Sequence, residues 1–533
     1  MIYNVATMFI QRNTKRIGDK RYHSTLLLHN YRRGSKVKHK VISNLSSWPE
    51  ELINQFELLL KGGKVTRGFK DLKHKQGKAY GAIKVIYEVA KRIGIIQAMG
   101  EGRAAVLCLL MIMGRILTNG SRLYLCNWAL DEAIEEVLKI SNFDEDDLYE
   151  ALDWISEQQA KIEKKLFKLR KNKDIEELFL YDVTSTYLEG MKNDLADWGY
   201  NRDGKKGKKQ IVIGLLTDKY GEPVSIEVFK GNTPDPQTVF SQIKKLAQRF
   251  AIKKVVFVGD RGMIKSEQIE NINARDWYYI TAITKPQIEK LREDKILQLE
   301  LFEENLCEVE YDEIRYILRR NPERKQEIER SRDSKIEYIN KKIEQKNKYL
   351  VEHPRASVKG GIEHIAKMVD KLKLTKVIEP QSTQHKITYV LNKEELEEKS
   401  RWDGCYVIKT NIPSSQLEKE IIHERYKDLT EVEKAFRTIK TGLLEIRPLF
   451  LRKETRTRGY AFICMISYLV TKYIWDRFKV LNIQQEFIYQ TLDRIQYVVY
   501  TFGKENIKVL PADYSEMQDN ILSLLNIKFP CQL

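Results

Sequence analysis

The sequence has few residues that bind zinc or form disulfides, and those few are widely separated. Its six cysteines lie at least 18 residues apart, and none of its eight histidines forms an HxxxH pair. This spacing excludes a dense disulfide framework and a zinc ribbon, and it argues against a histidine-based zinc site. Isolated thiols are typical of reducing compartments, so we expect the chain to be cytoplasmic.

Long apolar runs are also missing. The two longest, Ala104–Met113 and Ala461–Val470, are shorter than the roughly 20 residues that a membrane-spanning helix needs, and we interpret both as buried core helices. The N-terminus has no positively charged segment followed by an apolar stretch, so no secretion signal is expected. We therefore expect no membrane partner.

Positive charge, in contrast, is abundant. The chain has 92 Lys and Arg against 75 Asp and Glu, which gives a net charge of +17 and a pI near 9.2. A chain this basic commonly binds a polyanion, and DNA or RNA is the first candidate. With 533 residues, 42% of them hydrophobic, the chain is long enough for about three or four domains with sizeable cores.

The first 75 residues form a basic segment, with 16 Lys and Arg against 5 Asp and Glu. Alternating apolar positions in Tyr22–Asn30 and Lys36–Asn44 predict a β-hairpin, which turns at Tyr31–Ser35 and is followed by a helix over Pro49–Leu60. Two interpretations are open for this module, residues 1–75. It grips the DNA backbone, or its lysines only protect a solvated hairpin edge.

Residues 76–172 have helical periodicity and predict a helical domain, which is a second candidate for binding a DNA end. The predicted helices cover Ala79–Met99, Arg103–Leu117, Leu123–Leu138 and Asp146–Leu169. An acidic cluster between Asp131 and Glu150 contrasts with the basic N-terminus. This cluster is either a solvated face or a contact to a basic part of the chain.

From Leu178 the apolar pattern becomes strand-like, and we predict a mixed α/β sheet over residues 173–284. The predicted strands cover Leu178–Tyr181, Gln210–Thr217, Pro223–Lys230, Lys254–Val258 and Trp277–Ile283. Asp182 follows the first of these strands and Asp260 follows the fourth. Because ligands gather at strand ends of α/β sheets, both carboxylates are candidate site residues. Each also has an ordinary explanation, Asp182 as a loop cap and Asp260 as a turn residue.

Residues 285–410 interrupt this pattern and predict a large insertion. Charged helices are predicted over Pro322–Val351 and Ile362–Lys373. Strand-like pieces lie at 306–318, 384–391 and 404–410. Residues 411–505 then return to helices and complete the core, and residues 506–533 form a C-terminal tail. The last two predicted helices cover Thr455–Val480 and Ile483–Thr501.

One uninterrupted helix is predicted over Tyr426–Lys440, because it contains neither Pro nor Gly. Its apolar stripe recurs at helical spacing and comprises Val432, Ala435, Phe436, Ile439 and Leu443. Tyr426, Glu433 and Lys440 lie seven residues apart and share a different, polar face, to which Arg437 also belongs. Taken alone, this is an ordinary amphipathic helix with i,i+4 charge pairs. A carboxylate flanked by a phenol and two cations also suits a site that holds a metal beside phosphates.

A two-metal phosphoryl-transfer site requires carboxylate ligands, and these could be supplied by Asp182, Asp260 and Glu433 together. Mg²⁺ favours carboxylates combined with phosphate oxygens and needs neither His nor Cys. Two Mg²⁺ ions held by three acids would activate a nucleophile and stabilise a leaving oxygen at phosphorus. Mn²⁺ is expected to substitute for Mg²⁺.

In combination, these segments resemble the DDE transposases of bacterial insertion sequences, in the group marked by a Tyr-x2-Arg-x3-Glu-x6-Lys signature. Tyr426, Glu433 and Lys440 match that spacing, whereas the Arg position is Leu429 here, and Arg437 is a candidate replacement. The resemblance spans roughly residues 175–480. Its other matching segments are Leu180–Thr184, Gly231–Asp235, Val258–Gly262, Leu444–Pro448 and Arg456–Cys464.

The resemblance implies an RNase H-like α/β catalytic core in which Asp182, Asp260 and Glu433 are the catalytic residues and bind the metal ions. This core carries a large insertion and follows the basic hairpin module and the helical domain. A metal-bound water would cut the 3′ end of the element, and the freed 3′-OH would then attack target DNA. The implied partners are double-stranded DNA, from the element ends and the target, and a second copy of the chain in a synaptic complex.

Candidate DNA contacts are polar side chains near these acids. They are Tyr426, Lys440, Arg437, Arg261, Lys208 and Lys209. The last two belong to a lysine run that either tracks phosphates or is merely solvated. Trp277 and Trp402 are candidates for stacking on a displaced base, with burial in the core as the alternative for each.

The sequence therefore predicts a DNA transposase that binds, cleaves and joins the ends of an insertion sequence. Two alternatives are open. One is a catalytically silent DNA-binding derivative of such an enzyme, and the other is an RNase H-like nuclease without strand transfer. Terminal inverted repeats beside the coding region would separate the first interpretation from both.

Overall fold

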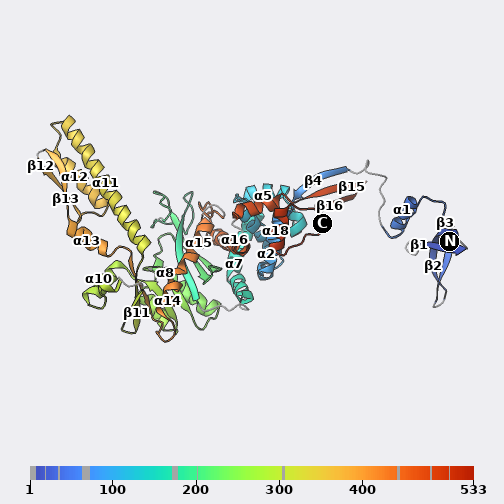
Figure 1. The fold of residues 1–533 in the computed structure, drawn as a ribbon, viewed down its shortest axis with the longest axis horizontal. Helices are drawn as coiled ribbons and strands as arrows, with labels where there is room; N and C mark the ends of the chain where they lie inside the picture. Colours follow the sequence, from blue (N-terminus) through green and yellow to red (C-terminus); the bar gives the residue numbers. More distant parts are fainter. Residues whose placement is uncertain are drawn as a thin grey trace. The chain divides into compact units, whose positions relative to one another are not determined.

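The computed structural model of the chain describes residues 8–17, 20–33, 36–62, 73–170, 178–200, 202–302, 306–383, 385–440, 444–479, 483–502 and 505–533. The chain divides into two compact units (Figure 1). The first contains Met1–Tyr80 with Asp493–Asp519 and Lys528–Leu533. The second contains Gly81–Leu492 with Asn520–Ile527.

A three-stranded antiparallel sheet, in the order β1-β2-β3, begins the first unit. Its elements are β1 (Met8–Ile17), β2 (Lys20–Arg33), β3 (Lys36–Asn44) and the helix α1 (Glu50–Leu60), which packs on one face. The predicted hairpin and helix are confirmed, and the turn residues Gly34 and Ser35 lie outside the described residues. The apolar residues of β1 are consecutive rather than alternating, so the sequence pattern does not predict this strand.

A second sheet in the first unit joins distant parts of the chain, in the order β16-β15-β4. Its strands are β4 (Lys73–Ala79), β15 (Gln496–Phe502) and β16 (Glu505–Val509). The helix predicted over Ile483–Thr501 is therefore wrong in its second half. Helix α17 (Gln485–Asp493) ends, and β15 follows because Tyr, Val, Thr and Phe favour a strand. Residues 506–533 contain most of β16 and the helix α18 (Glu516–Leu524) rather than a structureless tail.

An eight-stranded mixed sheet forms the centre of the second unit, in the order β10-β11-β14-β9-β8-β5-β6-β7. The five strands that come first in the chain are β5 (Leu178–Tyr187), β6 (Gln210–Asp218), β7 (Pro223–Phe229), β8 (Val256–Gly259) and β9 (Tyr278–Ala282). Strands β5, β6 and β7 pair antiparallel, whereas β8 and β9 run parallel to β5. The predicted mixed α/β sheet is confirmed.

Helices cover both faces of this sheet. On one face lie α8 (Asp235–Lys244), the π-helical turn Lys245–Arg249 and α9 (Ser266–Asn273). They pack on the odd-numbered residues of β5, such as Phe179 and Tyr181. On the other face lie α14 (Lys419–Lys427) and α15 (Leu429–Lys440). Because side chains alternate along a strand, Asp182 and Thr184 face α15.

The helices that precede the sheet pack around a late helix, α16 (Glu454–Phe478), which contacts α2, α4 and α7, and the main contacts of this group with the sheet are those of α7 and α16 with β7. The early helices are α2 (Gly81–Arg92), α3 (Ile95–Met99), α4 (Arg103–Leu117), α5 (Arg122–Asp131), α6 (Ile134–Leu138) and α7 (Glu145–Arg170). The predicted helix Ala79–Met99 is broken at Gly94, whose φ of 82° is left-handed. Within the described residues no single helix could cross a membrane; only α4 and α5, bent by 88°, pass that test as a pair.

The segment 285–410 divides between the sheet and an insertion. Its elements near the sheet are α10 (Lys285–Glu293), the 3₁₀ turn Leu299–Phe302, β10 (Cys307–Tyr311), β11 (Ile314–Arg320) and β14 (Cys405–Thr410). The three strands extend the core sheet beyond β9. The part that leaves the sheet therefore begins at Asn321 and ends at Gly404, where the amide of Asn321 donates to the carbonyl of Gly404 at 2.8 Å.

The insertion has a small core of its own. Its elements are α11 (Pro322–Glu352), α12 (Val358–Lys371), β12 (Ile378–Thr383), β13 (Lys386–Leu391) and α13 (Lys393–Arg401). The predicted charged helices correspond to α11 and α12. Ile339 and Ile343 of α11 pack against Ile365 and Val369 of α12, which attaches the two helices to each other (Figure 1).

Candidate active site

Asp182 lies in the middle of β5 and not after it, so the predicted strand end is wrong. Strand β5 is ten residues long in total, because Val183 to Tyr187, which follow Asp182, also pair with β6. The Asp182 carboxylate points to the face that α15 crosses, and its Oδ1 accepts a hydrogen bond from the amide of Val183 at 2.7 Å.

Asp260 directly follows β8, as predicted. Because β8 runs parallel to β5 with Gly259 opposite Tyr181, Asp260 is next in register beside Asp182. Its side chain is exposed, and its Oδ1 accepts hydrogen bonds from the amide of Arg261 at 2.6 Å and from the hydroxyl of Tyr426 at 3.5 Å.

Glu433 lies on α15 and is exposed, whereas the predicted apolar stripe of that helix is buried, apart from Leu443, which lies outside the described residues. The prediction of one helix over Tyr426–Lys440 is wrong, because α14 ends at Lys427 and α15 begins at Leu429. The two helices pack on different strands, α14 on β8 and β9 and α15 on β5 and β6.

The three carboxylates influence one another electrostatically. Burial, together with the negative charges of Asp260 and Glu433, raises the pKa of Asp182 to about 7, against the hydrogen bond from the amide of Val183. Partial burial and the charge of Asp260 also raise the pKa of Glu433, which Arg437 opposes. Three negative charges lie close together here, and nearby positive charges compensate them only in part. This arrangement favours the binding of a cation.

The three carboxylates offer a cation only oxygen ligands, and such a donor set fits Mg²⁺. No group of three or more His, Cys, Asp or Glu in the described part of the chain meets the distances that would hold one metal ion by itself. Mg²⁺ does not need such a group, because it commonly takes one or two protein carboxylates together with waters and substrate phosphate oxygens. The donor set therefore fits ions whose coordination is completed by a phosphodiester.

Tyr426 belongs to a stack of rings behind Asp260. Its ring centroid lies 6.5 Å from that of Tyr406, which stacks in turn on His423 at 6.0 Å. Burial, together with the charge of Asp260, raises the pKa of Tyr426 above its usual range. The phenol therefore stays protonated and remains a hydrogen-bond donor.

We predict that His423 makes the protein less stable in acid. Burial and the charges of Arg319 and Lys427 lower the pKa of His423 to about 4. Its stabilising contribution is present above the unfolded pKa of roughly 6.5 and is lost as the pH falls towards 4. Between pH 7 and pH 5 this amounts to about 2 kcal/mol, on the basis of roughly 1.4 kcal/mol per pKa unit.

Thermal denaturation at both pH values measures this effect. The variant His423→Gln should lack that part of the acid sensitivity. The same pH dependence in both proteins would contradict the assignment of the effect to His423.

Lys440 does not point freely into the site. Its Nζ donates to Thr184 Oγ1 at 2.9 Å and pairs with Asp203 Oδ1 at 2.7 Å. Asp203 also pairs with Arg447 at 2.7 Å, and its side chain is only 1% exposed. Lys440 thus connects α15, β5 and the loop after residue 201 through one buried carboxylate.

The other predicted DNA contacts are distributed differently. Arg261 and Arg437 are exposed near the acids, beside Asp260 and Glu433 respectively. Lys208 pairs with Glu189 at 2.6 Å, and Lys209 is half-buried. These two lysines lie by the far end of β5, about 17 Å along the strand from Asp182 at roughly 3.3 Å per residue, so the structure does not bring them to the acids.

Leu429, at the Arg position of the signature, is the first residue of α15 and is 7% exposed. Its side chain belongs to the buried surface of α15 and also borders the cavity described next. Nothing in the structure gives this position a polar role.

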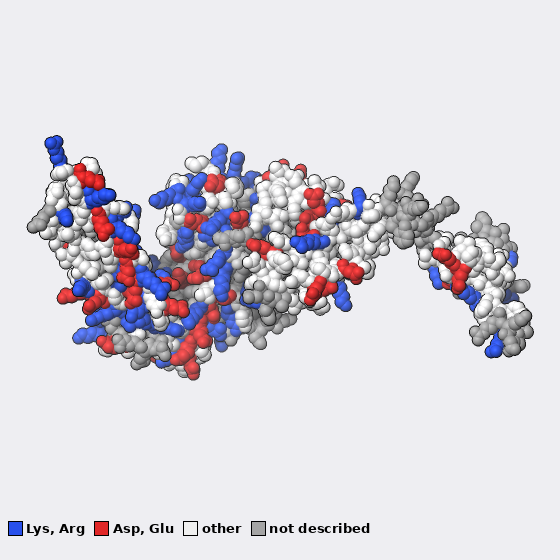
Figure 2. All heavy atoms as spheres, turned by 45° about the horizontal axis from the view of Figure 1, so that its top comes forward, with Lys and Arg blue, Asp and Glu red and all other residues white. Residues whose placement is uncertain are grey.

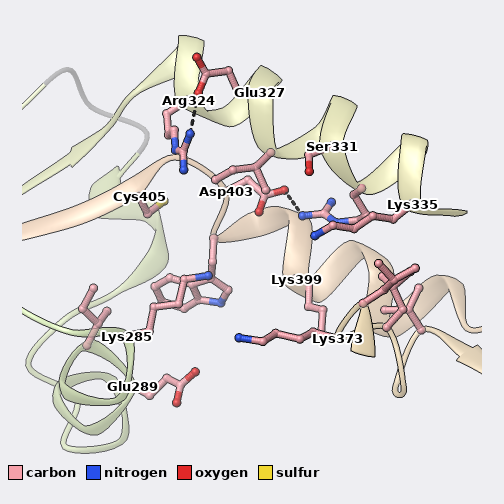
Figure 3. Close-up of a pocket in the computed structure, with 17 residues that line it drawn as sticks. Lys285, Glu289, Arg324, Glu327, Ser331, Lys335, Lys373, Lys399, Asp403 and Cys405 are labelled. Atoms are coloured by element: carbon pink, nitrogen blue, oxygen red, sulfur yellow. Dashed lines mark hydrogen bonds and ion pairs between the residues drawn. The ribbon is translucent and has the colours of Figure 1, made fainter. Parts of the chain in front are cut away.

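Two adjoining cavities lie between the acids and the insertion. The first, of about 810 Å³, is bordered by Asp260, Tyr426 and Glu433. The second, of about 560 Å³, lies farther into the insertion (Figure 3). Both share a set of mostly basic lining residues, which are Lys285, Arg324, Ile328, Lys335, Lys373, Trp402 and Cys405.

Lysines from four segments converge on the second cavity (Figure 3). They are Lys285 of α10, Lys335 of α11, Lys373 after α12 and Lys399 of α13. The two arginines of the cavity are paired within the protein, Arg324 with Glu327 at 2.7 Å and Arg332 with Asp403. Figure 2 shows the surface hollowed between the insertion and the sheet, with Lys and Arg along this hollow interspersed with Asp and Glu. The cavities therefore suit a polyanion beside the acids.

The two tryptophan candidates differ in position. Trp277 is 3% exposed and donates from Nε1 to the carbonyl of Lys253, so it belongs to the core. Trp402 borders both cavities, and its ring packs edge-on against Phe302 and carries the Arg292 guanidinium 5.6 Å from its centroid. Of the two, only Trp402 is placed to contact a ligand in these cavities.

Sequence reasoning missed Asp203 and Tyr406. In the sequence, Asp203 precedes Gly204, which is a pair typical of a turn. Its role as the buried partner of two cations depends on Lys440 and Arg447, which lie more than 200 residues later. Tyr406 lies on β14, and no local pattern links it to Tyr426. Only the pairing of distant strands could have identified either residue.

Comparisons with known proteins agree with the geometry in part. Residues 156–470, more than half of the chain, match the family described as "Transposase DDE domain". Residues 10–70 match the family described as "IS1634 family transposase, N-terminal domain". No curated protein matches the chain. Among solved structures, one similar chain is from the piggyBac transposase synaptic complex with hairpin DNA, with 7% identity, a TM-score of 0.36, and coverage of 77% of this chain and 78% of that one.

Proposed function

Because this chain belongs to the DDE transposase family of insertion sequences, we propose that it binds the ends of its element, cleaves them by metal-dependent hydrolysis and joins the 3′-OH to target DNA. The observation that carries this proposal is the approach of Asp182, Asp260 and Glu433, because the charge of Asp260 raises the pKa of both other acids and that of Glu433 also raises the pKa of Asp182. The direct test combines the purified chain, Mg²⁺ and a fragment with the element's terminal repeats. We expect release of 3′-OH ends.

We infer an RNase H-like catalytic core. The strand order β7-β6-β5-β8-β9, with three antiparallel strands followed by two parallel ones, supports this inference. So does the placement of one acid on the first strand and of the second directly after the fourth. The third acid lies on a helix that comes after the insertion.

In the proposed mechanism, two divalent ions, Mg²⁺ or Mn²⁺, would be held by Asp182, Asp260 and Glu433. When bound, such ions lower the pKa of water and neutralise charge that develops on phosphate oxygens. Tyr426 donates to Asp260 and keeps that carboxylate oriented. Arg261, beside Asp260, supplies a positive charge for the phosphodiester.

The cavities between the acids and the insertion give the DNA strand a path. Lysines from four segments offer charges to successive phosphates, and Trp402 offers an aromatic face to a displaced base. We propose that the N-terminal module and the helices of 76–172 bind the rest of the element end. A homodimer would hold the two ends together.

A catalytically silent derivative is the second candidate, since Leu429 replaces the Arg of the signature. Leu429 belongs to the buried surface of α15, while all three acids are present, so the structure favours the active enzyme. Cleavage of the element ends separates the two candidates.

We predict that binding to DNA weakens steeply with salt. If six or more phosphates are contacted, raising the salt from 50 to 200 mM should lower the affinity by about 10³-fold, because each contact releases a counterion. Fluorescence anisotropy with a labelled element end measures the slope. The double variant Lys373→Gln, Lys399→Gln should lower that slope by about 2. An affinity that does not depend on salt would contradict the electrostatic interpretation of the +17 charge.

A further inference from the structure

The N-terminal sheet has two faces of different chemistry. On one face, Ile10 and Leu27 pack against Ile53 of α1, and Arg12 hydrogen-bonds Asn54 and Glu57 of that helix. Side chains alternate along a strand, so the neighbours of Ile10 and Arg12 lie on the opposite face. The strand register extends this assignment to β2 and β3.

The face opposite α1 carries amide, hydroxyl and imidazole groups on either side of an apolar strip, because the register also places Phe9, Leu26, Leu28 and Val41 on it. Its polar residues are Gln11, Asn13 and Lys15 on β1, Tyr22, Ser24 and Asn30 on β2, and His39 on β3. Gln11 and Asn13 are exposed, and Gln11 Nε2 donates to Asn13 Oδ1 at 3.0 Å, which confirms that both lie on one face. Asn30 and His39 form a second hydrogen-bonded pair across strands. A face of neighbouring amides is suited to recognising other hydrogen-bonding groups.

Charge identifies the class of ligand. The described residues of β1, β2 and β3 contain ten Lys and Arg and no Asp or Glu. Three of the five acids of this module, Glu50, Glu51 and Glu57, lie on α1, and the other two, Asp19 and Asp71, lie outside the described residues. Lys36, Lys38 and Lys40 are exposed along the outer strand β3. The described residues of the sheet carry only positive charge, and the described acids of the module lie on the covering helix. The sheet therefore complements a polyanion electrostatically.

The dimensions fit the major groove of duplex DNA. Three strands spaced about 4.8 Å apart span about 10 Å between the outer backbones, and the groove is about 12 Å wide. Asn and Gln read adenine through paired hydrogen bonds, and sheets are among the elements that enter this groove. The register places Lys36, Lys38 and Lys40 on the α1 side of the edge strand, and from this edge their long side chains would reach the phosphates that border the groove.

We propose that this sheet face lies in the major groove of the element end and reads its bases through Gln11 and Asn13, while Asn30 and His39 lie farther along the same face, four residues along β2 from the position opposite Gln11. This proposal rests on the proposed function, because it names the module that recognises the DNA which the catalytic site cleaves. Neither family description assigns a ligand to this module.

The test compares two duplexes bound by the full-length chain without divalent metal. One duplex carries the element end, and the other has the same composition in shuffled order. The double variant Gln11→Ala, Asn13→Ala should lower the preference for the element end by about 10-fold or more, since each paired amide–base contact discriminates at about this level. Its affinity for the shuffled duplex should change by less than about threefold.

Two control variants separate base reading from other effects. Gln55→Ala removes an exposed amide from α1 on the same module and should leave the preference intact. Lys38→Ala should weaken binding to both duplexes alike. Asn13→Ala alone provides a milder version of the test, with circular dichroism as the check that each variant is folded.

Several results would overturn the proposal. One is a double variant that keeps the full preference of the wild type, and another is a wild type with no preference at all. Neither result bears on the proposed function, because Mg²⁺-dependent release of 3′-OH ends is measured separately. A transposase that cleaves its ends but reads them elsewhere would show cleavage together with an unaffected double variant.

Discussion

Replacing Asp260 with Asn is expected to slow cleavage of the element end at least about 10³-fold. The substitution keeps the shape of the side chain but removes the charge that would hold a metal ion. A loss of roughly 4 kcal/mol of transition-state stabilisation corresponds to that factor. Asp182→Asn and Glu433→Gln should have similar effects, because each removes one of the three carboxylates that influence one another.

Affinity for the element end should stay within about threefold in these variants, since phosphate contacts and not the acids dominate binding. Rates come from single-turnover cleavage with Mg²⁺, and affinities from anisotropy without it. The matched control is Glu431→Gln on the same helix, whose carboxylate pairs with Lys434 instead of facing the other acids. Full cleavage activity in Asp182→Asn, Asp260→Asn or Glu433→Gln would show that the site is assigned incorrectly.

Replacing Lys440 with Met is expected to destabilise the catalytic unit by about 3 kcal/mol, because it leaves a buried charge with less compensation. Asp203 is 1% exposed and lies 2.7 Å from both Lys440 and Arg447. The same variant also removes the hydrogen bond to Thr184 on β5. The melting temperature should fall by several degrees, which scanning calorimetry detects.

The exposed Lys434 on the same helix provides the control for this stability effect. Lys434→Met breaks only a surface pair with Glu431 and should cost less than about 1 kcal/mol. Adding Asp203→Asn to Lys440→Met should recover part of the loss, because the buried charge is then gone. If Lys440→Met melts like Lys434→Met, Lys440 is free for a role at the DNA and the buried pair is unimportant.

The convergence of the acids could be predicted from the sequence because it depends on short-range patterns. A buried apolar run precedes each aspartate, and β5 and β8 are parallel neighbours, so the end of β8 lies beside Tyr181 and brings Asp260 next to Asp182. The position of Asp182 within its strand could not be predicted. The apolar run stops there, since Thr184, Ser185 and Thr186 are small and polar, and their pairing with β6 keeps them extended.

The break between α14 and α15 has a similar origin. No Pro or Gly lies near Asp428, so the local sequence predicts one helix. The two helices pack on different pairs of strands, and this tertiary arrangement overrides the local preference. The same holds for β10, β11 and β14, whose membership of the core sheet depends on partners as distant as Ile280, which pairs with Thr410.

The way the insertion joins the sheet has a consequence for how such enzymes diversify. Strands β11 and β14 are hydrogen-bonded neighbours, with Arg320 opposite Cys405. The chain therefore departs and returns at adjacent positions, where Gly404, with a φ of 75°, lets the two backbones approach. A two-residue turn could close this hairpin in place of residues 322–403. Residues 322–403 could therefore be lengthened, replaced or deleted in the course of evolution. None of these changes would shift the register of a strand that carries the acids.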